Sequence, residues 1–234
     1  MKLLAIETST PACSAALFID GEVYERFEIA PKAHTQLLLP MIDSLMADAG
    51  LRPQQLDALA FSRGPGSFTG VRISTGVIQG IAFGADLPVV PVSTLAAMAQ
   101  DFFMQHLIDT AFVALDARIE EVFWGIYQRN PEGYATLSGI EVVCPPASVN
   151  IPELAGAGIG SGWAVYAQLL SDRLTVPLLE LDAERLPRAS AVARLGAYGF
   201  GLGQAVSAEQ AMPVYLRDKV AKTEAERLAE KQTA

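Results

Sequence analysis

The feature that most constrains the fold is a pattern that occurs twice along the chain. Residues 4–18 read LAIETSTPACSAALF, and residues 113–127 read VALDARIEEVFWGIY. Laid over each other without a gap, at a shift of 109 residues (113 − 4), each copy has an apolar strand, an acidic residue at its end and a second apolar strand. Glu7 in the first copy corresponds to Asp116 in the second. This repetition predicts two related α/β lobes.

The segments around the two copies predict how each lobe is built. Alternating or continuous apolar runs indicate strands, and apolar residues at helical spacing indicate helices. Pro40 falls inside the first helix, so a kink or a later start is expected there. Ser93 is expected to cap the third helix. We expect strands at 2–6, 13–19, 22–29, 56–62 and 89–92, and helices at about 35–49, 69–85, 94–102, 164–172 and 188–200.

The length of the chain fits two such lobes. With 234 residues it can form two small lobes that share a core. We expect an N-terminal lobe over residues 1–105 and a C-terminal lobe over residues 106–218. Residues 219–234 are rich in charges of both signs and poor in apolar residues, so they form a charged C-terminal tail that is either a marginal helix or a frayed end.

Composition narrows the classes of protein that fit. Hydrophobic residues make up 51% and charged residues 18% of the chain, which is typical of a globular protein, and no apolar run is long enough for a membrane span. Cys13 and Cys144 lack CxxC spacing, so we expect neither a disulfide framework nor a zinc site, and we expect a cytoplasmic protein. A net charge of −9 disfavours a broad nucleic-acid face, so any role with nucleic acid is expected to work through a partner.

A glycine-rich loop, RGPGSFTGVR, occupies residues 63–72. It lacks the Gly-Lys-Ser/Thr sequence that ends a Walker A loop. It also does not match the dinucleotide fingerprint, because its third glycine lies one residue beyond the position that the fingerprint requires. We therefore expect a turn that ends a strand and begins a helix capped by Ser67 or Thr69, with direct ligand binding as the alternative. The residues of this structural loop are Gly64, Pro65, Gly66, Ser67 and Gly70.

The helix that follows this loop has too few polar residues for a helix exposed to water. Its strongly polar residues fall on one stripe, Arg72, Thr75 and Gln79. Glycines recur every fourth residue, at Gly76, Gly80 and Gly84. Such a helix is expected to be covered on both sides, and a ridge of glycines lets another helix approach closely. We expect it to form half of a four-helix interface with the helix near residues 34–46, the other half coming from another molecule.

Candidate chemistry is confined to the acidic strand ends. His34 and His106 are the only histidines and lack metal-site spacing, so no metal site is expected. An acidic residue followed by hydroxyl residues can bind a magnesium-bound water and a phosphate. In the alternative interpretation, the two acidic residues have only a structural role and accept hydrogen bonds from backbone N–H groups at the ends of their strands. The Gly-rich stretch 155–163 either lets an adenosine approach or is a plain loop. The candidate nucleotide-binding residues are Glu7, Thr8, Ser9, Thr10 and Asp116.

Four segments in this order resemble the TsaB family, also called YeaZ: LAIETSTPACSAAL, RGPGSFTGVRIS, LDARIEEVFWGIY and PVYLRD. The resemblance spans nearly the whole chain. It implies an α/β ASKHA fold, related to actin and hexokinase, of two RNase H-like lobes with a short second lobe. It also implies a paralogue of TsaD, a glycoprotease-like protein whose histidine metal motif this sequence lacks, which argues against a metallopeptidase.

The resemblance further implies a non-catalytic subunit that binds and stabilises TsaD. By the same resemblance, the complex would transfer threonylcarbamoyl from its adenylate to N6 of adenosine 37 in tRNAs reading codons that begin with A. The TsaE ATPase would dock on the pair, tRNA would bind only through the complex, nucleotide would sit on partner subunits, and the chain alone would form a homodimer. An ATP-dependent ASKHA phosphotransferase is the alternative. The implied partner interface is Leu37, Leu38, Met41, Ile42, Leu45, Arg72, Thr75, Gly76, Gln79 and Gly80.

Overall fold

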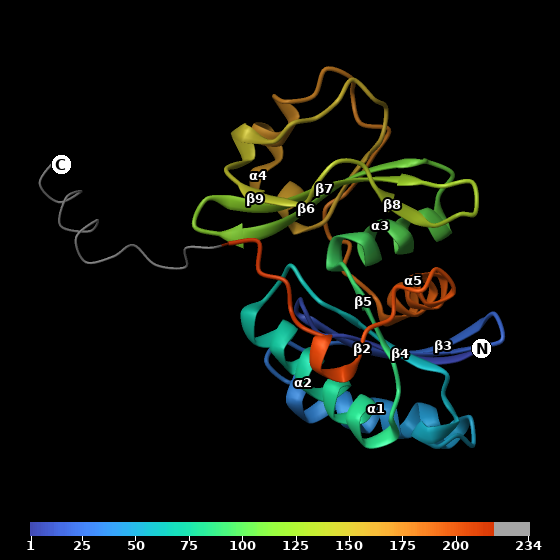
Figure 1. The fold of residues 1–234 in the computed structure, drawn as a ribbon. Coiled ribbons are helices and arrows are strands. Elements are labelled where there is room, and N and C mark those ends of the chain that lie inside the picture. Colours follow the sequence, from blue (N-terminus) through green and yellow to red (C-terminus); the bar gives the residue numbers. More distant parts are fainter. Residues whose placement is uncertain (218–234) are drawn as a thin grey trace, which may run out of the picture.

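Two mixed β-sheets form the framework of the molecule and lie one above the other (Figure 1). The computed structural model describes residues 1–217, so the predicted charged tail at 219–234 lies outside the described residues. The strands of the first sheet are β1 (Lys2–Glu7), β2 (Ala12–Ile19), β3 (Glu22–Ile29), β4 (Ala58–Ser62) and β5 (Val89–Val92). Those of the second are β6 (Thr110–Arg118), β7 (Glu121–Arg129), β8 (Ala135–Leu137), β9 (Val142–Cys144), β10 (Ala157–Ile159) and β11 (Glu180–Asp182).

The two sheets repeat one topology. The first has the order β3-β2-β1-β4-β5, and the second has the order β8-β7-β6-β10-β11 when it is followed from the corresponding edge. In each sheet the first three strands are antiparallel, and the last two run parallel to the central strand. The repeated pattern in the sequence therefore corresponds to β1–β2 and β6–β7. The predicted ASKHA fold of two RNase H-like lobes is confirmed.

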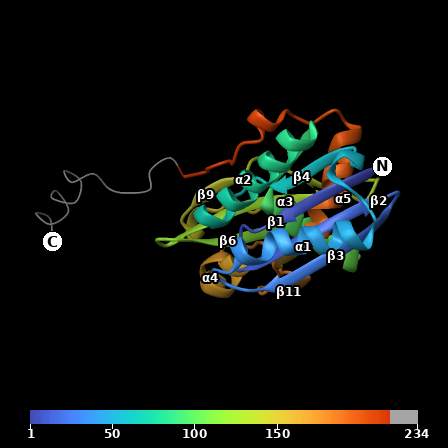
Figure 2. The ribbon, with the colours of Figure 1, turned by 90° about the horizontal axis from the view of Figure 1, so that it is seen from below.

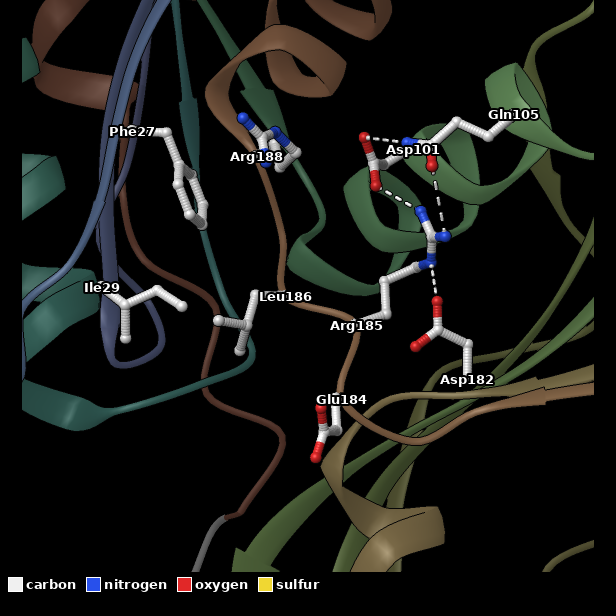
Figure 3. A pocket seen from close by; sticks show the side chains of 9 residues that line it. All are labelled: Phe27, Ile29, Asp101, Gln105, Asp182, Glu184, Arg185, Leu186 and Arg188. Atoms are coloured by element: carbon white, nitrogen blue, oxygen red, sulfur yellow. Dashed lines mark hydrogen bonds and ion pairs between the residues drawn. The ribbon is translucent and has the colours of Figure 1, made fainter.

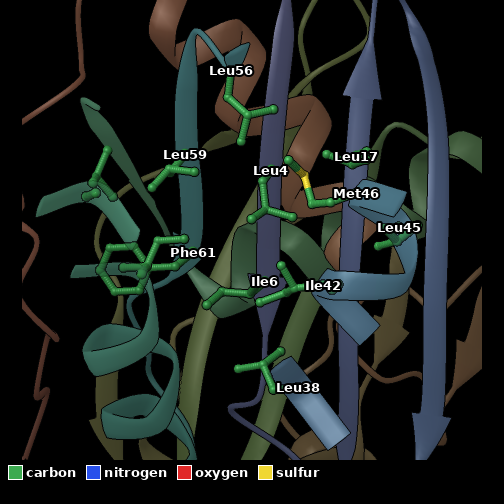
Figure 4. Packing of buried hydrophobic residues seen from close by; sticks show 14 of the residues in the cluster. Leu4, Ile6, Leu17, Leu38, Ile42, Leu45, Met46, Leu56, Leu59 and Phe61 are labelled. Carbon is green, nitrogen blue, oxygen red and sulfur yellow. The ribbon is translucent and has the colours of Figure 1, made fainter. Parts of the chain in front are cut away.

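Two helices cover the outer face of the first sheet, α1 (His34–Asp48) and α2 (Phe68–Ala85) (Figure 2). The helix α1 starts at His34 and includes Pro40, so the later start considered from the sequence does not occur. Pro40 and Gln36, whose carbonyl cannot accept a helical hydrogen bond from Pro40, are both exposed residues. One apolar stripe of α1 points toward the strands and forms the core of this layer (Figure 4). Its residues are Leu38, Ile42, Leu45 and Met46.

The layer between the sheets consists of one helix from each half of the chain. The helix α3 (Thr94–Gln105) begins at Ser93, whose side chain accepts hydrogen bonds from two backbone N–H groups, as predicted, and it packs on the second sheet. The helix α5 (Ala189–Gly201) crosses back and packs on the first sheet. A Cβ at Gly196 would lie 2.5 Å from that of Ala60, so α5 approaches the strands closely. Packing therefore crosses the predicted boundary at 105/106.

The remaining elements complete the second lobe and return the chain to the first. The helix α4 (Ser161–Ser171) covers the far face of the second sheet, around the buried Trp163. After α5, Val206 pairs with Val89, and the chain passes along α2 before it reaches the β6–β7 hairpin. We call residues 211–217 the C-terminal strap. The short 3₁₀ helices are η1 (Pro53–Gln55), η2 (Pro146–Ser148) and η3 (Ala208–Gln210).

Candidate functional site

The first acidic strand end is completely buried. Glu7 ends β1, and its Oε1 accepts hydrogen bonds from the backbone N–H and, at 2.5 Å, from the hydroxyl of Ser9. Its Oε2 has no hydrogen-bond partner among the described residues. Burial raises the pKa of Glu7 above its ordinary value, and the nearby hydroxyl of Ser62 and the hydrogen bonds from Ser9 oppose this rise.

The glycine loop fills the space beside this strand end. Ser67 N–H donates to the carbonyl of Ser9 at 2.7 Å, and the hydroxyl of Thr8 donates to the carbonyl of Gly70 at 2.7 Å. A Cβ added at Gly66 would lie 2.5 Å from the Ser9 carbonyl oxygen. A Cβ added at Gly70 would lie even closer to the Thr8 carbonyl oxygen. The predicted nucleotide residues from Glu7 to Thr10 are thus brought together, but they contact the protein itself. A phosphate bound here would have to displace the loop.

The loop also ends one element and begins another, as its sequence predicts. Gly64 has a φ of 104°, in the region that favours glycine, and a Cβ there would meet the Val214 carbonyl oxygen at 2.9 Å. Ser67, rather than Thr69, caps α2, because its side chain accepts from Gly70 N–H at 3.4 Å.

The second acidic strand end is also engaged by neighbouring residues. One oxygen of Asp116 accepts from the backbone N–H of Arg118 at 2.9 Å and from the hydroxyl of Tyr166 at 3.4 Å. The other oxygen pairs with the Arg118 guanidinium at 3.1 Å. Burial, followed by the charge of Asp116, raises the pKa of Tyr166. Asp116 therefore fixes the β6–β7 hairpin, in which residues 118–120 all have positive φ.

The Gly-rich stretch at 155–163 is not a plain loop, because it contains β10 and the start of α4, and its glycines serve close packing. A Cβ at Gly158 would lie 2.8 Å from the Trp163 ring, and one at Gly162 would lie 2.7 Å from the Cβ of Ala114. The Trp163 indole N–H donates to the carbonyl of Phe112 at 2.8 Å. These glycines let α4 and β10 pack tightly against β6, so the space expected for an adenosine holds protein atoms.

Three residues of the implied partner interface are in the core of the first lobe. Leu38, Ile42 and Leu45 are buried against the sheet and present no surface to a partner, which corrects the sequence-based assignment. The physical reason is that this stripe of α1 is the one that covers the strands (Figure 4). Leu37 and Met41, on the flank of the same helix, are only half-buried.

The polar stripe of α2 holds the C-terminal strap. Arg72 Nε donates to the Tyr215 hydroxyl at 3.0 Å, and Gln79 Nε2 donates to the Ala211 carbonyl at 3.1 Å. Thr75 is buried and donates to the carbonyl one turn earlier in α2. A contact of the chain with itself therefore accounts for the polar residues on this otherwise apolar helix.

The glycine ridge, in contrast, is open. A Cβ at Gly76, Gly80 or Gly84 would meet no described atom within 4 Å. Phe83 lies on the same helix with 79% of its surface exposed. We call the surface formed by these residues and the half-buried residues of α1 and α2 the helix-pair face. Its residues are Leu37, Met41, Gly76, Val77, Gly80, Phe83 and Gly84.

A charged pocket that the sequence did not indicate lies between β3, α3 and the segment before α5 (Figure 3). It has a volume of about 330 Å³. The Arg185 guanidinium is buried beside it and pairs with Asp101 and, at 2.8 Å, with Asp182. Burial raises the pKa of Asp101, and Arg185 opposes this rise. Because these partners are far apart in the sequence, no local motif reveals them.

Each of the two histidines contacts a polar group of the protein itself. His34 Nε2 lies 2.9 Å from the Thr10 carbonyl, and His106 Nδ1 lies 3.0 Å from Glu180. Among residues 1–217, no three His, Cys, Asp or Glu side chains are grouped so as to hold a metal ion. In the same part of the chain, every helix is too short or too polar to cross a bilayer.

Comparisons with known proteins give a consistent result. The family model described as "TsaD: tRNA N6-adenosine threonylcarbamoyltransferase" matches residues 27–225. The tRNA threonylcarbamoyladenosine biosynthesis protein TsaB of Escherichia coli K12 is 41% identical, over 94% of this chain and 96% of that protein. The protein of the same name from Haemophilus influenzae is 40% identical, over 94% and 95%. The solved structure of YeaZ from Pseudomonas aeruginosa is 43% identical, with a TM-score of 0.86, and the match covers 92% of this chain and 99% of that one. The chain therefore belongs to the TsaB (YeaZ) family.

Proposed function

We propose that this chain is a non-catalytic subunit that binds and stabilises a TsaD protein through the helix-pair face. The pair transfers threonylcarbamoyl from its adenylate to N6 of adenosine 37 in tRNAs that read codons beginning with A. The observation that carries the proposal is the open glycine ridge of α2.

Three glycines inside one helix are unfavourable unless something requires them. Each costs about 1 kcal/mol relative to alanine in a helix interior. The described residues of the chain give no reason for this cost, because no atom lies near Gly76, Gly80 or Gly84. A helix of another molecule supplies the reason, since small residues let two helices approach closely. The exposed ring of Phe83 beside the ridge gives such a contact an apolar anchor.

The same face accounts for the expected partners. An exposed apolar surface of this kind is typically covered, so the chain alone forms a homodimer and exchanges it for the TsaD heterodimer. The TsaE ATPase docks on that pair, and tRNA reaches the chain only within the complex, in the cytoplasm. Nucleotide belongs to the partner subunits in this scheme.

The closed surroundings of both acids support the absence of catalysis in this chain. The turn from Thr8 to Thr10 is covered by the glycine loop, and Asp116 is paired with Arg118. The alternative, an ATP-dependent phosphotransferase, needs the loop to leave that turn. Calorimetry with Mg-ATP distinguishes the two, because micromolar binding to the isolated chain that is lost in Glu7→Gln would favour the phosphotransferase.

The partner proposal is tested by placing a long side chain on the ridge. Gly80→Arg should fold, because its Cβ points into open space, and should no longer co-elute with TsaD in size-exclusion chromatography. Gly201→Arg is the matched control, since Gly201 is also helical and equally open but lies at the end of α5. The proposal fails if Gly80→Arg binds TsaD as well as Gly201→Arg does.

A further inference from the structure

An exposed aromatic pair lies at the N-terminal end of α2, with an arginine over one of its two rings. The Phe68 and Tyr215 ring centroids are 5.8 Å apart, and the Arg72 guanidinium lies 3.6 Å from the Phe68 centroid. Phe68 is 53% exposed and Tyr215 46% exposed. We call these three residues the aromatic–arginine cluster.

The charge of Arg72 has no carboxylate partner among the described residues. Its Nε donates to the neutral Tyr215 hydroxyl, which holds the guanidinium over the Phe68 ring. Six other arginines are paired with carboxylates, namely Arg26, Arg118, Arg129, Arg185, Arg188 and Arg217, whereas Arg52, Arg63, Arg173 and Arg194, like Arg72, have no such pair among residues 1–217. Arg72 differs from these four in lying over an exposed aromatic ring. In a protein of net charge −9, a guanidinium that is fixed beside exposed rings and has no carboxylate partner in residues 1–217 is suited to an anionic ligand that also carries a flat ring.

We propose that the aromatic–arginine cluster contacts one unpaired nucleotide of the tRNA, with the base stacked on the exposed ring of Phe68 and the phosphate on the free edge of Arg72. The inference rests on the proposed function, which brings tRNA to the complex. Stacking on an aromatic ring is available to any base and needs no broad basic surface, so the contact is compatible with the acidic composition.

The cluster adjoins one end of the helix-pair face and extends beyond it. Arg72 lies one turn before Gly76, about 6 Å along the axis of α2 at 1.5 Å per residue, and Phe68 lies about 12 Å from Gly76. Phe68 and Tyr215 are therefore outside the helix-pair face, and a TsaD protein on the glycine ridge would lie beside them.

The test measures binding of a fluorescein-labelled RNA hairpin with a single-stranded loop, by anisotropy, to the TsaD complex and to the full chain alone. Phe68→Ala should weaken binding about tenfold, the loss expected for one stacked base. Tyr24→Ala is the matched control, because Tyr24 is an aromatic residue of β3 with 55% exposure, and it should have no effect. Arg72→Gln should lower the slope of log K against log salt by about one.

Several outcomes overturn the inference. Equal effects of Phe68→Ala and Tyr24→Ala, or equal affinity for a blunt RNA duplex of the same stem, exclude a stacked unpaired base. Complete competition by an equimolar amount of adenosine monophosphate would mean a free-nucleotide site instead. Thermal melting of each variant excludes unfolding as the cause. If Phe68→Ala still co-elutes with TsaD while RNA binding is unchanged, this inference fails and the partner proposal stands.

Discussion

Replacement of glycine by alanine is predicted to have opposite effects on stability at two positions of α2, Gly70 and Gly80. A Cβ at Gly70 would lie 3.0 Å from the carbonyl carbon of Thr8 and closer still to its oxygen. These are backbone atoms of a turn held by hydrogen bonds from Thr8 and Ser67, so they cannot rotate away. A Cβ at Gly80 would meet no described atom within 4 Å.

The magnitudes follow from these surroundings. Overpacking a tight site costs typically 1–3 kcal/mol, and the steric conflict here involves backbone, so Gly70→Ala should destabilise the chain by about 2 kcal/mol after its gain in helix propensity. Gly80→Ala should stabilise the free monomer by about 1 kcal/mol, which raises the melting temperature by about 2–4 °C. It should nevertheless weaken TsaD binding, because the methyl group occupies the space of the approaching helix.

The assay is thermal unfolding of both variants and the parent chain at two protein concentrations. The lower concentration isolates the monomer, since any homodimer through the ridge makes the melting temperature depend on concentration. A destabilised Gly80→Ala monomer would refute the reasoning, because it would mean that the ridge is packed inside the chain. A Gly70→Ala variant as stable as the parent would show that the loop is not fixed on the Thr8 turn.

Three further predictions concern buried groups. Because burial raises the folded-state pKa of Glu7 above its ordinary 4.5, the folded state binds the proton more tightly, and stability falls as pH rises from about 4.5 through the folded pKa. Glu7→Gln should therefore be more stable than the parent in urea at pH 7, with a difference that vanishes below pH 4.5. Arg185→Ala leaves Asp101 buried without its partner and should cost about 3 kcal/mol in the same urea titration. Burial, with smaller effects of Glu7 and Glu28, raises the pKa of Cys13 to about 11, so iodoacetamide at pH 8 should alkylate this thiol only after unfolding.

The repeated lobes could be predicted because their signal is local. A strand, an acid at its end and a second strand lie within a few residues of one another, and the same order recurs at residues 4–18 and 113–127. The exchange of α3 and α5 between the lobes could not be predicted in this way. Both helices are rich in alanine and other apolar residues, so their periodicity shows that they are buried but not which sheet buries them.

The partner surface was predicted only in part, for a related reason. The apolar stripe of α1 indicates a buried face, but helical periodicity does not distinguish burial against the chain's own sheet from burial against another protein. Leu38, Ile42 and Leu45 pack against the sheet. In the same way, Arg72 and Gln79 indicate a polar stripe, but its partner is the C-terminal strap, more than 100 residues later in the sequence.

The glycines of α2 and its loop have two different physical causes, although they look alike in the sequence. Gly66 and Gly70 are required by atoms of the chain itself, because a side chain at either would collide with the turn after β1. Gly76, Gly80 and Gly84 are not required by any described atom. If folding alone decided the sequence, only Gly66 and Gly70 would be needed, and α2 would be more stable with alanine at the three ridge positions. Their presence is therefore best explained by a contact with another molecule, and substitutions on the ridge should change binding without harming the fold.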